Sequence, residues 1–523
     1  MSPLPDFETS INQDFGTIAD LIGLHATLRP DNPALRDDSR TLNYRQLDEL
    51  MNRVAAALQR DGLKLGDAVA VCAASSVDYA ALFLGALRAG VAVAPLAPSS
   101  TPASLVRMVQ DADAKLLFLD AGTADVLKDV SGVRRVALDG GGAHESFDAW
   151  LAAPDAQPTA VRVEPSTPFN IIYSSGTTGE PKGIVQGHGM RWAHVRRGAK
   201  YEYGPSTVTL LSTPLYSNTT LVVFFPTLAY GGCASLMPKF DAGRYLQLAQ
   251  QQRVTHTMLV PVQYQRLMAR SDFDRHDLSS FQYKFSTSAP FNAALKADVL
   301  ERWPGGLVEF YGMTEGGGTC ILEAHLHPDK LHTVGQPAEG SDIRLIDEAG
   351  QEVAPGEAGE VVGHSAGMMT GYHRQPEKTR EAEWFDASGK RFIRTGDIGR
   401  FDAQGFLTLF DRRKDMIISG GFNIYPSDLE AVLRQHPAVL EASVVGVPSQ
   451  EWGETPVGFV VAREGAEPLE PEALRAWANA QLGKTQRLSQ LLFVDELPRS
   501  AIGKVLKREL RDRLVALNSR AGA

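Results

Sequence analysis

Tyr173-Ser-Ser-Gly-Thr-Thr-Gly-Glu-Pro-Lys-Gly183 is the stretch that best indicates both the fold and the chemistry of this chain. It continues the apolar run Phe169–Tyr173, which predicts a strand. Its three glycines permit close approach of the backbone to a ligand, and successive N–H groups in such a turn form an anion-binding concavity. Hydroxyl groups add donors and Lys182 adds a positive charge, a combination that suits a polyphosphate. The predicted phosphate contacts are Ser174, Ser175, Gly176, Thr177, Thr178 and Lys182.

This loop is not a Walker A loop. That motif requires a glycine directly before the lysine and a helix that starts there. Here Pro181 precedes Lys182, and proline lacks an N–H donor. The alternative interpretation is a flexible surface loop rich in small polar residues, and composition alone does not choose between the two.

Strand and helix patterns alternate on the N-terminal side of the loop. Apolar residues at helical spacing predict a helix over Tyr44–Gln59, and buried strands are predicted at Ala68–Cys72, Val91–Leu96 and Lys115–Leu119. Such alternation indicates βαβ units and a largely parallel sheet, which binds ligands beyond the carboxyl ends of its strands. The predicted fold class is therefore α/β.

Two changes of pattern on the C-terminal side predict the domain organisation. Ser341–Tyr372 consists of short strands and turns, which predicts a small β-rich subdomain. From about Asp415 strands and helices return over roughly 110 residues, an ordinary domain size. We predict a large N-terminal domain, residues 1–413, of βαβ-type subdomains plus the β-rich one. A small mobile α+β C-terminal domain, residues 414–523, is predicted to follow.

Bulk composition excludes several classes of function. The chain has 52 basic and 62 acidic residues and a formal charge of −10, which argues against broad binding of nucleic acid or of an anionic membrane. Cys72, Cys233 and Cys320 have neither metal-ligand spacing nor the pattern of a disulfide framework. The N-terminus lacks a signal-peptide pattern, and no apolar run reaches the ~20 residues that a bilayer requires. We expect a soluble cytoplasmic protein without a membrane span.

Four further motifs follow the loop, and each has an ordinary structural interpretation. Tyr311-Gly-Met-Thr-Glu315 is also typical of a turn before a capped helix, and Arg394-Thr-Gly-Asp397 of a common turn. Asp411-Arg-Arg-Lys-Asp415 is typical of a solvated charge cluster. Lys504, which ends the run Leu497–Lys504, would alone be taken for a surface lysine.

Together and in this order, the five motifs resemble the adenylate-forming (ANL) superfamily. This superfamily holds acyl- and aryl-CoA synthetases, adenylation domains of nonribosomal peptide synthetases, and firefly luciferase. The resemblance covers roughly residues 15–515. It implies an AMP-forming acid–CoA ligase that uses ATP, Mg²⁺ and coenzyme A.

The resemblance also implies a role for individual residues. Thr178 belongs to the catalytic phosphate loop, Thr314 bonds the α-phosphate and Glu315 helps to hold Mg²⁺, for which a carboxylate is a suitable ligand. Lys504 reaches the acid carboxylate and the α-phosphate, and Lys414 is the hinge. The other implied nucleotide contacts are Ser288, Ala289, Pro290, Glu309, Phe310, Tyr311, Gly312, Asp397 and Arg412. Among these, Tyr311 stacks on adenine, and Asp397 and Arg412 contact the ribose.

Two half-reactions are implied. The acid carboxylate attacks the α-phosphorus of ATP and expels pyrophosphate, while the protein supplies positioning and charge stabilisation. The C-terminal domain then rotates, and a thiol attacks the adenylate and releases AMP. Because the sequence ends soon after Lys504 without a carrier domain, coenzyme A is the expected thiol.

The implied coenzyme A site rests on fewer matches. Gly420, Gly421 and Trp452 resemble the CoA-tunnel region of related ligases. Lys484-Thr-Gln-Arg-Leu488 departs from the Lys-Tyr-Lys-x-Pro that the family often has. No contact to the CoA phosphates is therefore assigned to that segment.

The acid pocket is predicted from segments that match the family less well. Ser217 stands where the family often has the histidine of Pro-Leu-Phe-His. These segments contain no obvious cation to pair with a second carboxylate, so a monocarboxylic aliphatic or aryl acid is expected. Gly316–Gly318 is expected to leave room for a bulky or extended acid. The predicted pocket residues are Tyr216, Ser217, Asn218, Met313 and Gly317.

Three alternatives remain open. An acyl-AMP ligase would pass its adenylate to a separate carrier protein, and a luciferase-like oxygenase belongs to the same superfamily. A regulator would bind nucleotide without chemistry, but Glu315, Asp397 and Lys504 are all present, which argues against it. A monomer or a homodimer is expected.

Overall fold

The computed structural model describes residues 6–140, 144–175, 181–412, 415–419, 422–449, 452–465, 469–483, 486–500 and 503–521. The chain divides into two compact units. The first is Met1–Ile343 with Gly363–Ile393, and the second is Arg344–Val362 with Arg394–Ala523. The predicted boundary between residues 413 and 414 lies outside the described residues and stays a prediction.

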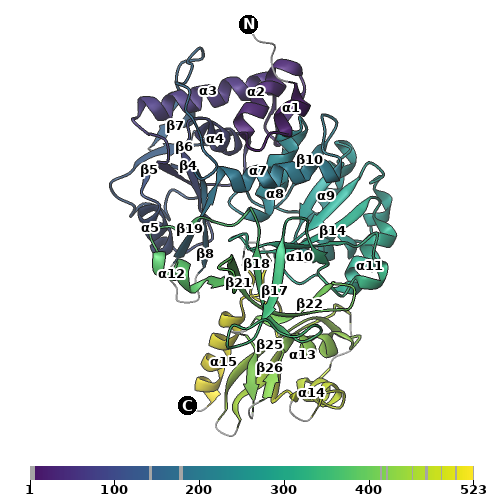
Figure 1. Ribbon diagram of the computed structural model, residues 1–523. Coiled ribbons are helices and arrows are strands. Elements are labelled where there is room, and N and C mark those ends of the chain that lie inside the picture. Colours follow the sequence, from purple (N-terminus) through teal and green to yellow (C-terminus); the bar gives the residue numbers. More distant parts are fainter. Residues whose placement is uncertain are drawn as a thin grey trace. The chain divides into compact units, whose positions relative to one another are not determined.

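An eight-stranded sheet in the first unit carries the strands on both sides of the phosphate loop (Figure 1). Its order is β19-β9-β8-β4-β3-β5-β6-β7, and the neighbours from β8 to β7 are parallel. β9 is antiparallel to both β8 and β19. The predicted parallel sheet is confirmed here. The bounds are β3 Ala68–Cys72, β4 Ala92–Pro95, β5 Ala114–Leu119, β6 Arg134–Ala137, β7 Glu145–Ser146, β8 Pro168–Ser175, β9 Pro181–Gly187 and β19 Gly371–Tyr372.

A nine-stranded sheet forms the other half of the first unit, in the order β16-β15-β14-β13-β12-β10-β11-β1-β2. Its six central strands, from β14 to β1, are parallel. β15, β16 and β2 are antiparallel additions at the edges. The bounds are β1 Pro33–Arg36, β2 Thr41–Asn43, β10 Val208–Leu211, β11 Cys233–Leu236, β12 His256–Leu259, β13 Tyr283–Ser286, β14 Gly306–Gly312, β15 Thr319–Glu323 and β16 Gln336–Pro337.

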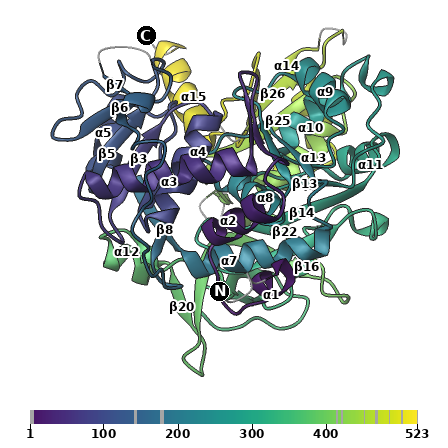
Figure 2. The same ribbon diagram turned by 90° about the horizontal axis from the view of Figure 1, so that it is seen from above.

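Helices cover the faces of both sheets, and one apolar core joins the facing sides of the two sheets through α3, α4 and α8 (Figures 1 and 2). The predicted helix over Tyr44–Gln59 is confirmed as α3, which begins at a capping box between Asn43 and Gln46. None of the helices in the described part of the chain is long and apolar enough to cross a membrane. The helices of the first unit are α1 Phe7–Ile11, α2 Ile18–Leu28, α3 Tyr44–Arg60, α4 Val77–Arg88, α5 Pro102–Asp111, α6 Phe147–Trp150, α7 His188–Arg196, α8 Asn218–Ala229, α9 Ala242–Gln251, α10 Pro261–Met268, α11 Ala293–Arg302 and α12 Pro376–Glu381, with 3₁₀ turns η1 Arg197–Tyr201, η2 Phe273–Arg275 and η3 Pro328–Lys330.

A small five-stranded sheet follows, and it extends further along the chain than the predicted β-rich segment Ser341–Tyr372. Its order is β17-β18-β21-β20, with β22 paired to β21. Gly371–Tyr372, by contrast, joins the eight-stranded sheet as β19. Local pattern located the short strands but not the sheet that each one joins, because pairing partners are distant in sequence. The bounds are β17 Asp342–Ile346, β18 Gly359–His364, β20 Glu383–Phe385, β21 Arg391–Phe401 and β22 Leu407–Arg412.

The rest of the second unit is the predicted α+β C-terminal block. A sheet in the order β24-β23-β26-β25, with β27 parallel to β26, packs its two faces into separate apolar clusters. The apolar runs at 442–447 and 457–461 lie within β25 and β26. The bounds are β23 Ile417–Ser419, β24 Phe422–Ile424, α13 Pro426–Arg434, β25 Val439–Ser449, β26 Gly453–Ala462, α14 Pro471–Asn479, β27 Gln490–Phe493 and α15 Lys507–Ala521.

Candidate active site

Candidate residues in the first unit follow the carboxyl ends of three parallel strands of the nine-stranded sheet. β10 leads to Tyr216, Ser217 and Asn218, β13 leads to Ser288, Ala289 and Pro290, and β14 leads to Met313, Thr314 and Glu315. The Thr219 and Ser288 hydroxyls, which follow different strands, are 2.5 Å apart. Ser288 has a φ of +80°, which costs a non-glycine residue backbone strain, and such strained residues are enriched at functional sites. The strands thus gather the predicted adenine and acid segments at one edge, as parallel sheets do.

The phosphate loop connects the antiparallel strands β8 and β9. In this hairpin Ser174 lies opposite Lys182 and Ser175 opposite Pro181. Gly176, Thr177 and Thr178 lie outside the described residues, as do the side chains of Ser174 and Ser175. A strand, not a helix, follows the loop, so the anion site cannot use a helix N-terminus as a Walker A loop does. This agrees with the exclusion of that motif from Pro181.

A buried arginine connects the hairpin to the Thr314–Glu315 dipeptide. Arg191 donates to the side-chain oxygens of Asn170, at 3.1 and 2.9 Å, and of Gln186. Since arginine has no acceptor, both amides must turn their oxygens towards it. The Gln186 amino group therefore remains to donate to the backbone carbonyl of Thr314, at 2.6 Å. Burial lowers the pKa of Arg191 to about 9, so it stays charged at neutral pH.

Tyr372 contacts two of the predicted site residues at once. Its hydroxyl donates to Oε1 of Glu315 at 2.8 Å, and the Lys182 ammonium lies 5.2 Å from the centre of its ring. Burial and the Glu315 carboxylate both raise the pKa of the Tyr372 hydroxyl, which therefore remains a donor. The N–H of Met369 donates to the Glu315 carbonyl at 2.8 Å. No sequence motif pointed to Tyr372, Gln186 or Arg191.

The base of the hairpin is fastened to α5. The Tyr173 hydroxyl donates to Asp111 at 2.6 Å, and Nδ1 of His373 is 3.7 Å from the same carboxylate oxygen. Burial acts to raise the pKa of Asp111, but His373 and Tyr173 outweigh it and hold the pKa below its usual value. Asp111 therefore stays an acceptor.

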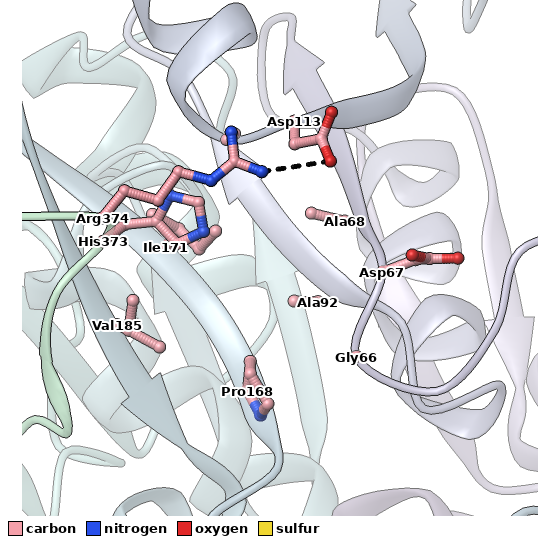
Figure 3. A pocket seen from close by; sticks show the side chains of 11 residues that line it. Gly66, Asp67, Ala68, Ala92, Asp113, Pro168, Ile171, Val185, His373 and Arg374 are labelled. Carbon is pink, nitrogen blue, oxygen red and sulfur yellow. Dashed lines mark hydrogen bonds and ion pairs between the residues drawn. The ribbon is translucent and has the colours of Figure 1, made fainter.

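A small cavity of about 150 Å³ lies at the amino ends of parallel strands in the eight-stranded sheet (Figure 3). Ala68, Ala92 and Pro168, the first residues of β3, β4 and β8, line it. Arg374 extends beside it and pairs with Asp113 at 3.3 Å. The cavity therefore lies at the amino ends of the parallel strands, away from the carboxyl ends where the candidate site gathers.

Glu309 and Phe310, predicted nucleotide contacts, have protein partners for their side chains. Glu309 is buried and ion-paired with Lys296, whose ammonium also donates to the carbonyls of Leu331 and Thr333. Burial raises the pKa of Glu309 and Lys296 opposes this. The Phe310 ring stacks on Phe285 at 5.5 Å. Any nucleotide contact at these two residues stays a prediction, as it does at Tyr311 and Gly312.

Protein atoms occupy the directions in which Cβ atoms on Gly316 and Gly317 would point, and the expected room for a bulky acid stays a prediction. A Cβ on Gly316 would lie 1.9 Å from the Gly367 carbonyl, and one on Gly317 would lie 2.7 Å from Cβ of Ile393. A Cβ on Gly363 would lie 1.4 Å from the Gly317 carbonyl. The glycines thus allow two backbone segments to touch. No open space lies where a Cβ on Gly317 would point. Its place in the acid pocket stays a prediction.

The other predicted acid-pocket residues lie at the start of α8 and beside β9. Ser217 is the N-cap of α8 and accepts from the Thr219 N–H. Oδ1 of Asn218 is buried and has no hydrogen-bond partner among the described residues. Met313 packs against the apolar cluster that contains Ile184 and Tyr372. Their contact with an acid stays a prediction.

In the second unit, Asp397 and Arg412 are brought together across the hairpin β21–β22, where they are directly paired. The backbone N–H of Asp397 donates to Thr395, whose hydroxyl donates to the Val361 carbonyl. The side chain of Arg412 is outside the described residues. Pairing of these two residues is compatible with their predicted contact to one ribose.

Lys504 stands on a tight turn fastened to β25. Ser500 donates from its N–H to the Lys504 carbonyl at 2.8 Å, and Gly503 before it has a φ of +76°. Arg499 bridges the Gly503 carbonyl, at 2.7 Å, and Glu441 of β25, at 2.8 Å. Trp452 is 51% exposed, while the predicted hinge residue Lys414 and the CoA-site candidates Gly420 and Gly421 lie outside the described residues.

The described residues fit a magnesium ion that is held mainly by a bound ligand. They contain no group of three or more His, Cys, Asp or Glu side chains that could hold a metal ion. Glu315 offers a carboxylate, and Tyr372 contacts both Glu315 and Lys182. Mg²⁺ commonly binds one or two protein carboxylates and completes its shell with phosphate oxygens and water, so one glutamate beside a phosphate loop suits it.

Two family profiles cover most of the chain. The AMP-binding enzyme profile matches residues 24–373, and the AMP-binding enzyme C-terminal domain profile matches residues 428–504. The chain is an AMP-binding enzyme. It belongs to the adenylate-forming superfamily, as the five motifs indicated.

Relatives of this AMP-binding enzyme match it over nearly their whole length. A fatty acid–[acyl-carrier-protein] ligase, ScoC, of Streptomyces coeruleorubidus is 32% identical over 95% of this chain and 96% of its own. A feruloyl-CoA synthase of Amycolatopsis sp. is 32% identical over 93% of this chain and 97% of its own. The crystal structure of ATP-bound MatB from Rhodopseudomonas palustris matches with a TM-score of 0.84 and 30% identity, covering 95% and 98% of the two chains.

Proposed function

We propose that this AMP-binding enzyme activates a monocarboxylic acid with ATP and transfers the acyl group to coenzyme A. The observation that carries the proposal is the seating of Thr314 and Glu315 against the phosphate-loop hairpin, through Gln186 and Tyr372. It supports the proposal because the Glu315 carboxylate and the Lys182 ammonium both contact Tyr372 next to the hairpin from which phosphate contacts are predicted.

In the first half-reaction, the ionised acid attacks the α-phosphorus of ATP and pyrophosphate leaves. Lys182, the loop hydroxyls and Lys504 offset the charge on the phosphates, and Thr314 holds the α-phosphate. Glu315 would hold Mg²⁺, which supplies further charge neutralisation when bound. The second half-reaction breaks the acyl–phosphate bond: a thiolate attacks the acyl carbon and AMP leaves. Rotation about Lys414 is proposed to separate the two steps.

A monocarboxylic acid is supported by the charge of the predicted pocket segments. Residues 212–221 and 313–319 contain one charged side chain, Glu315, and no cation. A second carboxylate in such a pocket would be desolvated without an opposite charge, which is costly. The names of ScoC and of the feruloyl-CoA synthase also refer to monocarboxylic acids.

Carrier-protein acylation is the second candidate, because the relative ScoC is named as a ligase of an acyl-carrier protein. The deciding experiment is an acid panel, fatty and aryl, scored by pyrophosphate release and by AMP release. Coenzyme A, a phosphopantetheinylated carrier protein or neither is added in parallel. Acid-dependent AMP release with coenzyme A alone supports the proposal. AMP release only with the carrier supports the alternative, and no acid-dependent pyrophosphate release from any acid would overturn both.

A further inference from the structure

Tyr372 occupies an unusual place between the two charged candidates of the first unit. It ends the two-residue strand β19, which pairs with β9 so that Tyr372 lies opposite Ile184. Lys182 is two residues earlier on β9. The Tyr372 side chain is buried beside Met369 and Ile393, which restricts the ring to one position.

Tyr372 contacts two residues of opposite charge, the carboxylate of Glu315 and the ammonium of Lys182. The hydroxyl donates to Glu315 at 2.8 Å, while the ring face lies 5.2 Å from the Lys182 ammonium. A ring face attracts a cation and a phenol hydroxyl donates to a carboxylate. One side chain therefore gives the anion a hydrogen bond and the cation a ring contact, and the two charges do not pair directly.

This arrangement matters because opposite charges attract, and without the Tyr372 side chain Lys182 and Glu315 could form a direct ion pair. Within the described residues no ion pair joins Lys182 and Glu315, and both contact the side chain of Tyr372. A direct pair would turn the lysine away from phosphate and the glutamate away from a cation, because each charge would be neutralised by the other. Tyr372 uses one oxygen of Glu315 and leaves the carboxylate a second oxygen for another ligand.

We infer that Tyr372 is a positioning residue that holds Glu315 and Lys182 apart and aims them at the phosphates of the nucleotide. The inference rests on the proposed ATP-dependent activation. The hydroxyl serves Glu315 and the ring serves Lys182, so the two contributions can be removed separately.

Two substitutions distinguish these contributions. Tyr372→Phe keeps the ring and removes the hydroxyl. We expect about a tenfold lower kcat for acid-dependent pyrophosphate exchange, a several-fold higher Mg²⁺ requirement and an unchanged KM for ATP. Tyr372→Leu removes both, and we expect it also to weaken binding of ATP several-fold when binding is measured calorimetrically without Mg²⁺. Attack of coenzyme A on a supplied acyl-adenylate is expected to be unchanged in Tyr372→Phe.

The matched control is Tyr245→Phe, which removes a buried tyrosine hydroxyl that donates to Thr257 at 2.8 Å in the same unit. It is expected to lose a similar amount of stability against urea and to keep the wild-type Mg²⁺ and ATP dependences. If Tyr372→Phe behaves like Tyr245→Phe in an active enzyme, the positioning role is wrong. If the wild-type protein shows no acid-dependent exchange, the proposed function fails instead, and the calorimetric comparison of Tyr372→Leu with wild type still tests the contact with Lys182.

Discussion

At the residue scale, Arg191 shows how one buried cation can orient the backbone of a candidate site residue. It is 1% exposed and faces two amide oxygens rather than a carboxylate. Both amide oxygens accept hydrogen bonds from Arg191, so the Gln186 amino group faces the Thr314 carbonyl. A charge that does not itself bond to Thr314 thus fixes the position of a residue expected to contact a phosphate.

Gln186→Glu tests whether the position of Thr314 depends on the Gln186 amino group. The carboxylate would still pair with Arg191, but an oxygen would replace the amino group against the Thr314 carbonyl and repel it. We expect kcat for pyrophosphate exchange to fall about 10- to 100-fold, corresponding to about 1.4–2.7 kcal/mol, with the protein still folded by circular dichroism.

The matched control is Gln46→Glu in the capping box of α3, where glutamate serves as well as glutamine. It should retain wild-type exchange. A folded Gln186→Glu enzyme with wild-type exchange would show that the Thr314 carbonyl does not need this donor.

Lys504 allows the two half-reactions to be separated. Lys504→Ala removes a cation expected at the α-phosphate, so acid-dependent pyrophosphate exchange should fall at least about 100-fold. Thiolysis of a supplied acyl-adenylate should be largely spared, because this lysine is proposed to withdraw before that step. Lys239→Ala, on an exposed lysine of the first unit, is the control. Equal loss in both half-reactions would contradict the role.

At the element scale, the glycine segment after β14 packs directly against the end of β18. Gly363→Ala would place a methyl group 1.4 Å from the Gly317 carbonyl, so one backbone must move. We expect a loss of about 1–3 kcal/mol in the free energy of unfolding, measured by urea denaturation. Gly204→Ala, where a Cβ would meet nothing within 4 Å, should remain within about 0.5 kcal/mol of wild type. Equal stability of the two variants would disprove the close packing.

At the scale of the whole molecule, buried imidazoles predict sensitivity to acid. Burial lowers the pKa values of His25, His188 and His256 to about 4. Between that value and the ordinary 6.5, the unfolded chain binds protons that the folded chain does not. Stability is therefore lost as the pH falls through this window.

His256→Gln tests how much His256 contributes to this loss of stability at acid pH. Glutamine can donate and accept as His256 does to Tyr201 and Thr255, but it does not titrate. The loss of unfolding free energy between pH 7 and pH 4, followed with urea, should be smaller than in wild type by about 1–3 kcal/mol. The exposed His332→Gln should leave the loss unchanged. If His256→Gln retains the full pH dependence, His256 is not among the responsible groups.

The sequence by itself determined the family and the α/β class, and it named the charged residues of the candidate site. These follow from local features: alternating strand and helix patterns for β3 to β5, and motifs in which glycine, hydroxyl, lysine and carboxylate groups lie a few residues apart. Pro181 alone excluded a Walker A loop, and the hairpin β8–β9 agrees with that exclusion.

Only the tertiary structure decided how those residues are held. Tyr372 follows Glu315 by 57 residues and Gln186 precedes Thr314 by 128, yet both bond to that dipeptide. Which strand joins which sheet edge, and which glycine touches which backbone, depends on packing between segments distant along the chain. Local patterns carry no record of such pairings, so the sequence could name Glu315 and Lys182 but not the tyrosine that separates them.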